Sequence, residues 1–170
     1  MARIVICVLI SFACLTSCNE LPSHEEYHAE NWSKRRMDVN PKDSLETGKT
    51  YLSIYSQIYS MSQHKTHNLT AMASMRNTSD TDTIFVTSAK YYDAQGKLIR
   101  TYFDKSIYLA PMETTEVIIE ELDIEGGTGS NFIFEWKKAE NTSEPLFEGI
   151  MNSTLGQQGL SFSTTGKRIK

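Results

Sequence analysis

Turn-forming residues recur about every ten residues from position 49 onward, and β-branched and aromatic residues fill the intervals. Short strands at this spacing are typical of an antiparallel sandwich or barrel. About 120 residues are enough to enclose one hydrophobic core. The spacing therefore predicts an all-β domain over residues 49–170, an antiparallel, immunoglobulin-like β-sandwich with roughly seven to nine short strands.

Alternation of apolar and polar residues places the strands within this domain. Residues 51–60, YLSIYSQIYS, also fit a helical stripe, but their serines and tyrosines favour a strand. The turn at 93–96, Asp-Ala-Gln-Gly between two apolar runs, predicts a hairpin. The expected strands are 51–60, 69–77, 83–92, 97–103, 107–110, 114–122, 131–136, 145–151 and 160–164.

The first eighteen residues have the layout of an export signal. Arg3 supplies a positive charge, a short apolar run follows, and small residues precede Cys18. The apolar run is shorter than the roughly twenty residues that a transmembrane helix needs. Residues 15–18, LTSC, resemble a bacterial lipobox, in which the cysteine is lipidated and becomes the new N-terminus. The alternatives are an ordinary signal peptide or an uncleaved anchor.

The cysteines support lipidation. The three cysteines are Cys7, Cys14 and Cys18, so removal of residues 1–17 as a lipoprotein signal peptide leaves Cys18 alone. A single cysteine forms neither an internal disulfide nor a cysteine metal cluster. A diacylglycerol on Cys18, with a third acyl chain in many bacteria, supplies the two or more chains that stable membrane anchoring needs.

Residues 18–48 are polar, mixed in charge and poor in aliphatic side chains, which predicts a disordered tether between the lipid and the domain. Tyr27 and Trp32 are the side chains in it that could dock on the domain. The run at 34–36, Lys-Arg-Arg, is either a contact for lipid headgroups or simply solvated.

The charge balance limits the partners. The net charge of −4 falls by one to −5 when Arg3 leaves with the signal, which argues against nucleic acid and against polybasic binding to anionic lipid.

Several segments occur in the order found in one bacterial family. They are YSQIYS, LTAMASMRNTS, KYYDAQGKLIRTY, EGGTGSNFIFEW and EPLFEGIMNSTLGQQGLSFSTTGK. The succession resembles the family named domain of unknown function 3124, and it covers about residues 49–168. The resemblance implies an exported, often lipoprotein-like protein without an assigned activity, and it offers no catalytic residues.

Two glycine-bearing loops are the most distinctive candidates for binding, at 126–131 (GGTGSN) and 154–159 (TLGQQG). If the strands between 114 and 164 form a direct meander, both loops emerge at the same end. Amides and hydroxyls there would suit a neutral polar ligand such as a glycan or a peptide backbone, whereas the alternative is plain turn chemistry. The candidate binding rim is Asn131, Asn152, Thr154, Gln157 and Gln158.

Metal and catalytic sites are not expected. The acidic residues near the first glycine loop do not have the spacing of an EF-hand or a calcium repeat, so a solvated acidic edge is favoured over a Ca²⁺ site. His64 and His67 are expected in the connection after the first strand, without a third ligand at metal spacing. The domain has no cysteine and no Gly-x-Ser-x-Gly elbow. The acidic residues are Glu120, Glu121, Asp123 and Glu125.

These features together predict a bacterial envelope lipoprotein without enzymatic activity, cofactor or metal. We expect a binding or assembly module, held by its lipid anchor near an envelope protein. The alternative is a ligand-capture domain for glycans or small polar molecules, and a hydrolase is third. Asn19 is not the aspartate that resembles an inner-membrane retention signal, so the outer membrane, at its periplasmic face or the cell surface, is the expected location.

Overall fold

The computed structural model describes residues 30–39, 44–154 and 159–170. Within them lie a 3₁₀ turn and twelve strands, more than the seven to nine expected. The expected strand at 51–60 is divided between β1 and β2, β3 is too polar to show alternation, and β12 has only two residues. The elements are η2 (Trp32–Arg35), β1 (Leu45–Ile54), β2 (Gln57–Ser60), β3 (Ser62–Asn68), β4 (Thr70–Arg76), β5 (Ile84–Tyr92), β6 (Leu98–Phe103), β7 (Ile107–Leu109), β8 (Thr114–Ile119), β9 (Ser130–Ala139), β10 (Leu146–Ser153), β11 (Leu160–Thr165) and β12 (Lys167–Arg168).

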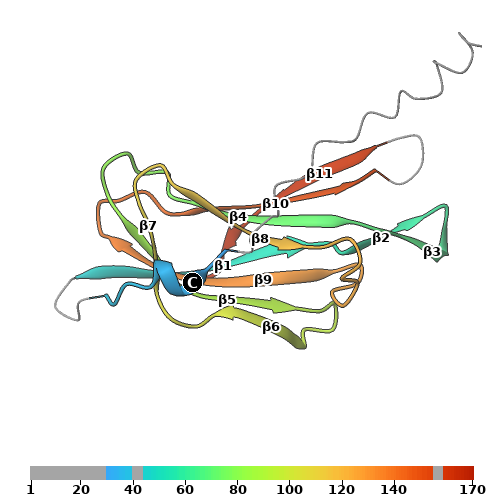
Figure 1. The fold of residues 1–170 in the computed structure, drawn as a ribbon, viewed down its shortest axis with the longest axis horizontal. Coiled ribbons are helices and arrows are strands. Elements are labelled where there is room, and N and C mark those ends of the chain that lie inside the picture. Colours follow the sequence, from blue (N-terminus) through green and yellow to red (C-terminus); the bar gives the residue numbers. More distant parts are fainter. Residues whose placement is uncertain (1–29, 40–43, 155–158) are drawn as a thin grey trace, which may run out of the picture.

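The strands form the predicted antiparallel β-sandwich (Figure 1). A six-stranded sheet has the order β12-β1-β9-β5-β6, with β7 also paired to β5, and a four-stranded sheet has the order β11-β10-β4-β8. The β4–β8 and β5–β9 pairs correspond to the B–E and C–F pairs of an immunoglobulin domain. The outer strands are exchanged, because β1 lies beside β9 and β10 lies beside β4.

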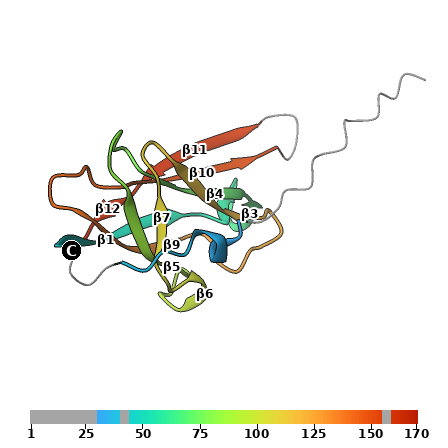
Figure 2. The same cartoon turned by 60° about the vertical axis from the view of Figure 1, so that its left-hand side comes forward.

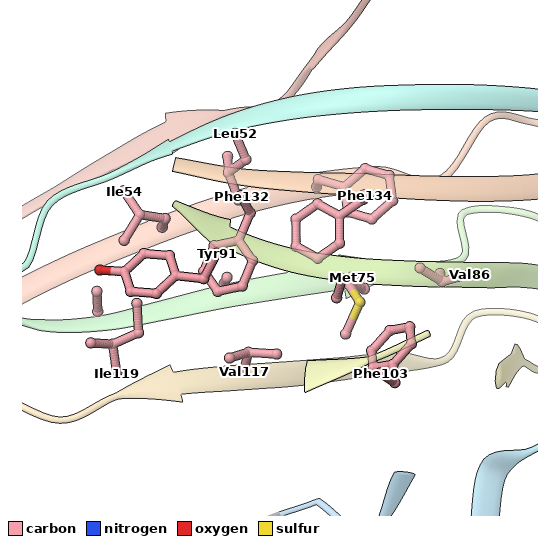
Figure 3. Packing of buried hydrophobic residues seen from close by; sticks show 14 of the residues in the cluster. Leu52, Ile54, Met75, Val86, Tyr91, Phe103, Val117, Ile119, Phe132 and Phe134 are labelled. Carbon is pink, nitrogen blue, oxygen red and sulfur yellow. The ribbon is translucent and has the colours of Figure 1, made fainter. Parts of the chain in front are cut away.

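The core lies between these two sheets. In β9, every second side chain from Ser130 to Lys138 is buried, as the two-residue period of a strand requires. Phe132 and Phe134 project into this core (Figure 3) and stack with ring centroids 5.2 Å apart. Phe134 also stacks at 4.4 Å on Phe147 from the opposite sheet. Each such ring contributes about 1.5–3 kcal/mol through burial alone, so this aromatic row joins the two sheets.

Gly48 allows the indole of Trp136 to lie directly on β1. A Cβ atom at Gly48 would come within 2.1 Å of the indole ring. Trp136 donates a 3.0 Å hydrogen bond from Nε1 to Thr50 Oγ1, and the guanidinium of Arg168 lies 5.1 Å from the ring centroid. The C-terminal strand is thereby attached to the first strand of the domain.

Residues 30–39, called here the N-terminal strap, pack on the six-stranded sheet (Figure 2). The ring of Trp32 lies 4.9 Å from that of Phe103, so this part of the expected tether is docked on the domain through one of the two side chains that could do so. Tyr27 lies outside the described residues. Arg35 donates to Glu113 at 2.5 Å, and Met37 donates its amide to the Ser106 carbonyl.

The start of the domain precedes the expected boundary. The strand β1 begins at Leu45, so residue 49 falls inside it. The polar side chains of Glu46 and Lys49, together with the breaker Gly48, conceal the beginning of this strand in the sequence.

Candidate interaction surface

Three connections lie at one end of the sandwich, called here the loop end: the β2–β3 hairpin, the β5–β6 turn and the β8–β9 loop (Figure 1). The facing ends of β10 and β11, at Ser153 and Leu160, lie there too. The strap lies toward the other end. It bridges to Ile107, which pairs with Val86, whereas the loop end is marked by Asn131, which pairs with Ser53 and Tyr92. The two ends therefore carry different parts of the chain.

The residues of the candidate binding rim do not all come together. The first glycine-bearing loop and the end of β10 lie at the loop end, but β8 and β9 belong to different sheets rather than to a meander. The burial pattern places Asn131 on the outer face of the six-stranded sheet and Asn152 on the outer face of the four-stranded sheet. These two amides face away from one another. Thr154 is exposed after β10, and Gln157 and Gln158 lie outside the described residues.

The first glycine loop packs onto a buried cluster of hydroxyl groups. Tyr91 Oη shares a 3.1 Å hydrogen bond with Ser56 Oγ and donates another of 3.1 Å to Ser130 Oγ, which donates at 2.7 Å to the Ile54 carbonyl. Burial raises the pKa of Tyr91, although the bonds to Ser130 and Ser56 oppose the shift. A Cβ atom on Gly126 would lie 1.9 Å from Tyr91 Oη. The glycine is therefore required by close packing.

Backbone contacts also hold this loop. Gly127 has a φ of 65°, donates its amide to the Ile124 carbonyl and accepts a hydrogen bond from the Gln57 amide at 3.1 Å. The geometry matches the plain turn that was one of the two interpretations of GGTGSN. The loop connects two strands of different sheets, whereas glycine-rich phosphate-binding loops connect a strand to a helix.

Arg100, on β6, binds the acidic residues of the β8–β9 loop. Its guanidinium donates to Asp123 Oδ2 at 3.0 Å and to Glu125 Oε2 at 3.3 Å. Burial works against the charge of Arg100, but Tyr102 and Asp123 outweigh it and raise the pKa of the guanidinium. Two of the four acidic residues near the glycine loop are thus paired with a cation. Across the described residues, no three His, Cys, Asp or Glu side chains gather in a way that could hold a metal ion.

The apolar residues between these acids face the solvent. Leu122 is 87% exposed and Ile124 is 49% exposed, while Asp123 between them turns toward Arg100. Leu98, on the neighbouring strand β6, is also exposed and lines a shallow hollow of 340 Å³ together with Glu125. We call Leu98, Leu122 and Ile124 the apolar corner. The sequence interpretation missed it, because Leu122 was expected to be the last residue of a strand.

The exposed apolar side chains are unevenly distributed over the described residues. The large exposed apolar residues at the loop end are Tyr59, Met61, Leu98, Leu122, Ile124 and Leu160; those elsewhere are Met37, Met112 and Ile169. Single exposed apolar residues are ordinary, but a concentration at one end is typical of an interaction surface. The alternation of Leu122 and Ile124 with acids, after the strand has ended, is the sequence signal that could have revealed part of it.

None of the helical segments in the described part of the chain has the length and apolar character that a membrane crossing requires.

Comparisons with known proteins identify the family of this domain. A search of curated proteins gives no match. The crystal structure titled "Crystal Structure of Thermotoga maritima 1070" is similar, with a TM-score of 0.43 and 11% sequence identity over 71% of this chain and 92% of that chain. The family described as "Protein of unknown function (DUF3124)" matches residues 47–169. That match spans most of the chain and confirms the resemblance seen in the sequence, so the protein belongs to the DUF3124 family.

Proposed function

We propose that this protein is a noncatalytic binding or assembly module that a lipid on Cys18 holds at the bacterial envelope, with the outer membrane as its location. The proposal combines the lipobox-like LTSC sequence with the apolar corner. The observation that carries the binding role is the orientation of the β8–β9 loop. Arg100 binds the acids Asp123 and Glu125, and Leu122 and Ile124 are left facing the solvent.

The size of the apolar corner fits a weak contact that benefits from confinement. Burial of a leucine or isoleucine side chain yields about 1.5–3 kcal/mol, so three partly exposed side chains provide on the order of 5 kcal/mol before the costs of association. Such a contact is weak between freely diffusing molecules. Membrane confinement raises the effective concentration of a partner in the same envelope, which makes a weak contact productive.

Charge indicates what this partner presents. The carboxylates around the apolar corner are Asp93, Glu120, Glu121, Asp123 and Glu125. Arg100 neutralises part of this charge, and Lys97 is the nearest other cation in the sequence. A protein surface with an apolar centre and a basic rim is complementary to such a corner. A second copy of this acidic chain would meet like charges there.

Glycan capture is the less supported alternative. It was based on one rim containing the amides of Asn131 and Asn152, and these lie on opposite outer faces of the sandwich. Hydrogen bonding of one ligand to both amides is therefore not favoured by the geometry. A glycan array probed with the purified protein, and with Asn131→Ala and Asn152→Ala variants, tests this alternative directly.

Photo-crosslinking in the native cell tests the proposed function. A photoreactive amino acid at Leu122 should trap one discrete envelope protein, and Arg100→Glu should abolish that product by releasing the acids of the loop. The same amino acid at Met112, which is 69% exposed away from the loop end, is the matched control. Equal products from both positions, or none from Leu122 in a protein shown to be in the membrane fraction, would contradict the binding role.

A further inference from the structure

The strands β2 and β3 form an arm that is separate from the sandwich. They pair only with each other in a two-stranded sheet and extend from the loop end (Figure 1). An isolated hairpin is marginally stable, but the root of this arm is fixed. Ser56 and Leu69, on either side of the root, are fully buried, and the Leu69 amide donates to the Ser56 carbonyl at 2.9 Å. The arm is therefore a defined projection.

The tip of the arm exposes an apolar side chain on strained backbone. Met61, between β2 and β3, has a φ of 63° and is 92% exposed. A residue with a side chain is disfavoured in this left-handed region, so the tight turn at the tip fixes the position of Met61 at a cost. Tyr59 beside it is 62% exposed, and a register shift lies between Tyr59 and Ser60. The tip thus presents an aromatic residue and a flexible thioether to the solvent.

The arm also differs in charge from the rest of the protein. Residues 57–68, QIYSMSQHKTHN, contain Lys65 and no aspartate or glutamate, within a chain of net charge −4. Most of β3 is exposed, so Lys65 lies in water. The combination of an apolar tip, a tyrosine and a lysine is characteristic of the boundary between bilayer and water, where tyrosine rings lie at headgroup level and lysine stems extend past apolar surface.

We propose that the arm is a second membrane contact, in which Tyr59 and Met61 enter the interface of an anionic lipid surface and Lys65 lies among the headgroups. The inference rests on the proposed lipid anchor, which brings the bilayer within reach. The contact orients the domain, because two apolar side chains add too little burial to anchor it alone.

Covalent geometry permits both contacts with one bilayer. Twelve Cα–Cα steps separate Cys18 from Glu30, where the strap begins, and they span at most about 40 Å. The sandwich between strap and loop end is about as long as β9, whose ten residues rise roughly 34 Å. The arm adds about 24 Å beyond the loop end. A tether of about 40 Å therefore reaches the plane of the arm's tip when the long axis of the domain is inclined to the bilayer, with the loop end still about two Debye lengths above it.

The arm also separates the acidic loops from the lipid. The seven residues of β3 rise about 24 Å, which is several times the Debye length of roughly 8 Å at physiological salt. Repulsion between anionic lipid and carboxylates such as Glu125 is then largely screened. A protein partner would need a shaped pocket to receive a narrow convex tip, whereas a bilayer needs none. Lipid is therefore the favoured binding partner of the arm.

Two methionines provide a matched test. Met112 also has a left-handed φ, of 59°, and is highly exposed, but it lies away from the loop end. The full-length gene is expressed with Met61→Cys or Met112→Cys, and the purified membrane form is labelled with an environment-sensitive fluorophore. The proteins are reconstituted into vesicles of phosphatidylcholine, with or without phosphatidylglycerol. Intact mass establishes separately whether Cys18 carries lipid.

The label at 61 should brighten several-fold and be quenched by spin-labelled lipid in the anionic vesicles, while the label at 112 should stay in water. Lys65→Glu should lower the apparent affinity of the arm for anionic lipid roughly tenfold to thirtyfold. Water exposure at 61 in a lipidated protein would overturn the arm inference and leave the anchor standing. A lipid-free protein whose label at 61 still responds to anionic vesicles would support the arm and overturn the anchor. Burial of the label at 61 by an added envelope protein, but not by lipid, would also overturn the inference.

Discussion

The substitution Gly126→Ala should destabilise the protein more than any other single methyl group added to the β8–β9 loop. Its Cβ would lie 1.9 Å from Tyr91 Oη and 2.6 Å from the Oγ atoms of Ser56 and Ser130. All three hydroxyl-bearing residues are at most 1% exposed, so none can move into solvent. The added methyl group must displace the loop or break the hydroxyl cluster.

The expected cost follows from these contacts. Overpacking of a well-filled core costs about 1–3 kcal/mol, and each lost hydrogen bond in the cluster costs about 0.5–1.5 kcal/mol. Gly126→Ala should therefore lower the free energy of unfolding by roughly 2–4 kcal/mol, which urea denaturation can measure. Gly129→Ala is the control in the same loop, because its Cβ would meet only Ala94 at an ordinary 3.5 Å. Equal stabilities of the two variants would refute the proposed packing of this loop.

Three further predictions test the strap and the ion pairs Arg35–Glu113 and Lys138–Glu46. Trp32→Ala should remove the contact with Phe103, speed proteolytic cleavage of the strap and lower the free energy of unfolding by about 1–2 kcal/mol. Trp32→Phe should retain most of the protection against cleavage. Identical cleavage of the native protein and both variants would contradict docking of the strap. Burial acts to raise the pKa of Glu113, but the Arg35 guanidinium holds this pKa below its usual range. The stabilisation from the ion pair is therefore present above the usual pKa range of a glutamate and is lost as the pH falls toward the lowered value. Unfolding free energies across mildly acidic pH should show this loss in the native protein and less of it in Glu113→Gln; parallel pH profiles would argue against it. Lys138 is buried and lies 2.6 Å from Glu46, so Glu46→Gln should destabilise the fold more than Lys138→Met, as thermal melts would show, and the reverse order would contradict the pairing.

The sequence predicted the strands that bury one face. Alternation located β5 to within one residue and the central part of β9, because residues such as Val86, Phe132 and Phe134 face the core at every second position. It failed for β3, whose residues SQHKTHN bury little and therefore show no alternation. The beginning of β1 was hidden for a related reason, since Lys49 lies on its solvent-facing side and Glu46, on the other face, is a charged residue paired with Lys138.

The candidate site was harder to predict, because its geometry depends on which sheet each strand joins. Adjacent strands in the sequence suggested a direct meander, but the connections before and after β9 cross between sheets. That crossing turns Asn131 and Asn152 to opposite faces. Leu122 was assigned to a strand on its apolar character, whereas β8 ends at Ile119 and a turn follows, with the Asp123 amide donating to the Glu120 carbonyl.

The central claim is that this β-sandwich acts from a membrane to which Cys18 attaches it. The most direct measurement is the intact mass of the protein extracted with detergent from its native membranes, together with the mass of its N-terminal peptide. The account predicts a chain that begins at Cys18 and carries a diacylglycerol thioether, with or without a third acyl chain. Retention of residues 1–17, or an unmodified N-terminus at another position, would contradict it.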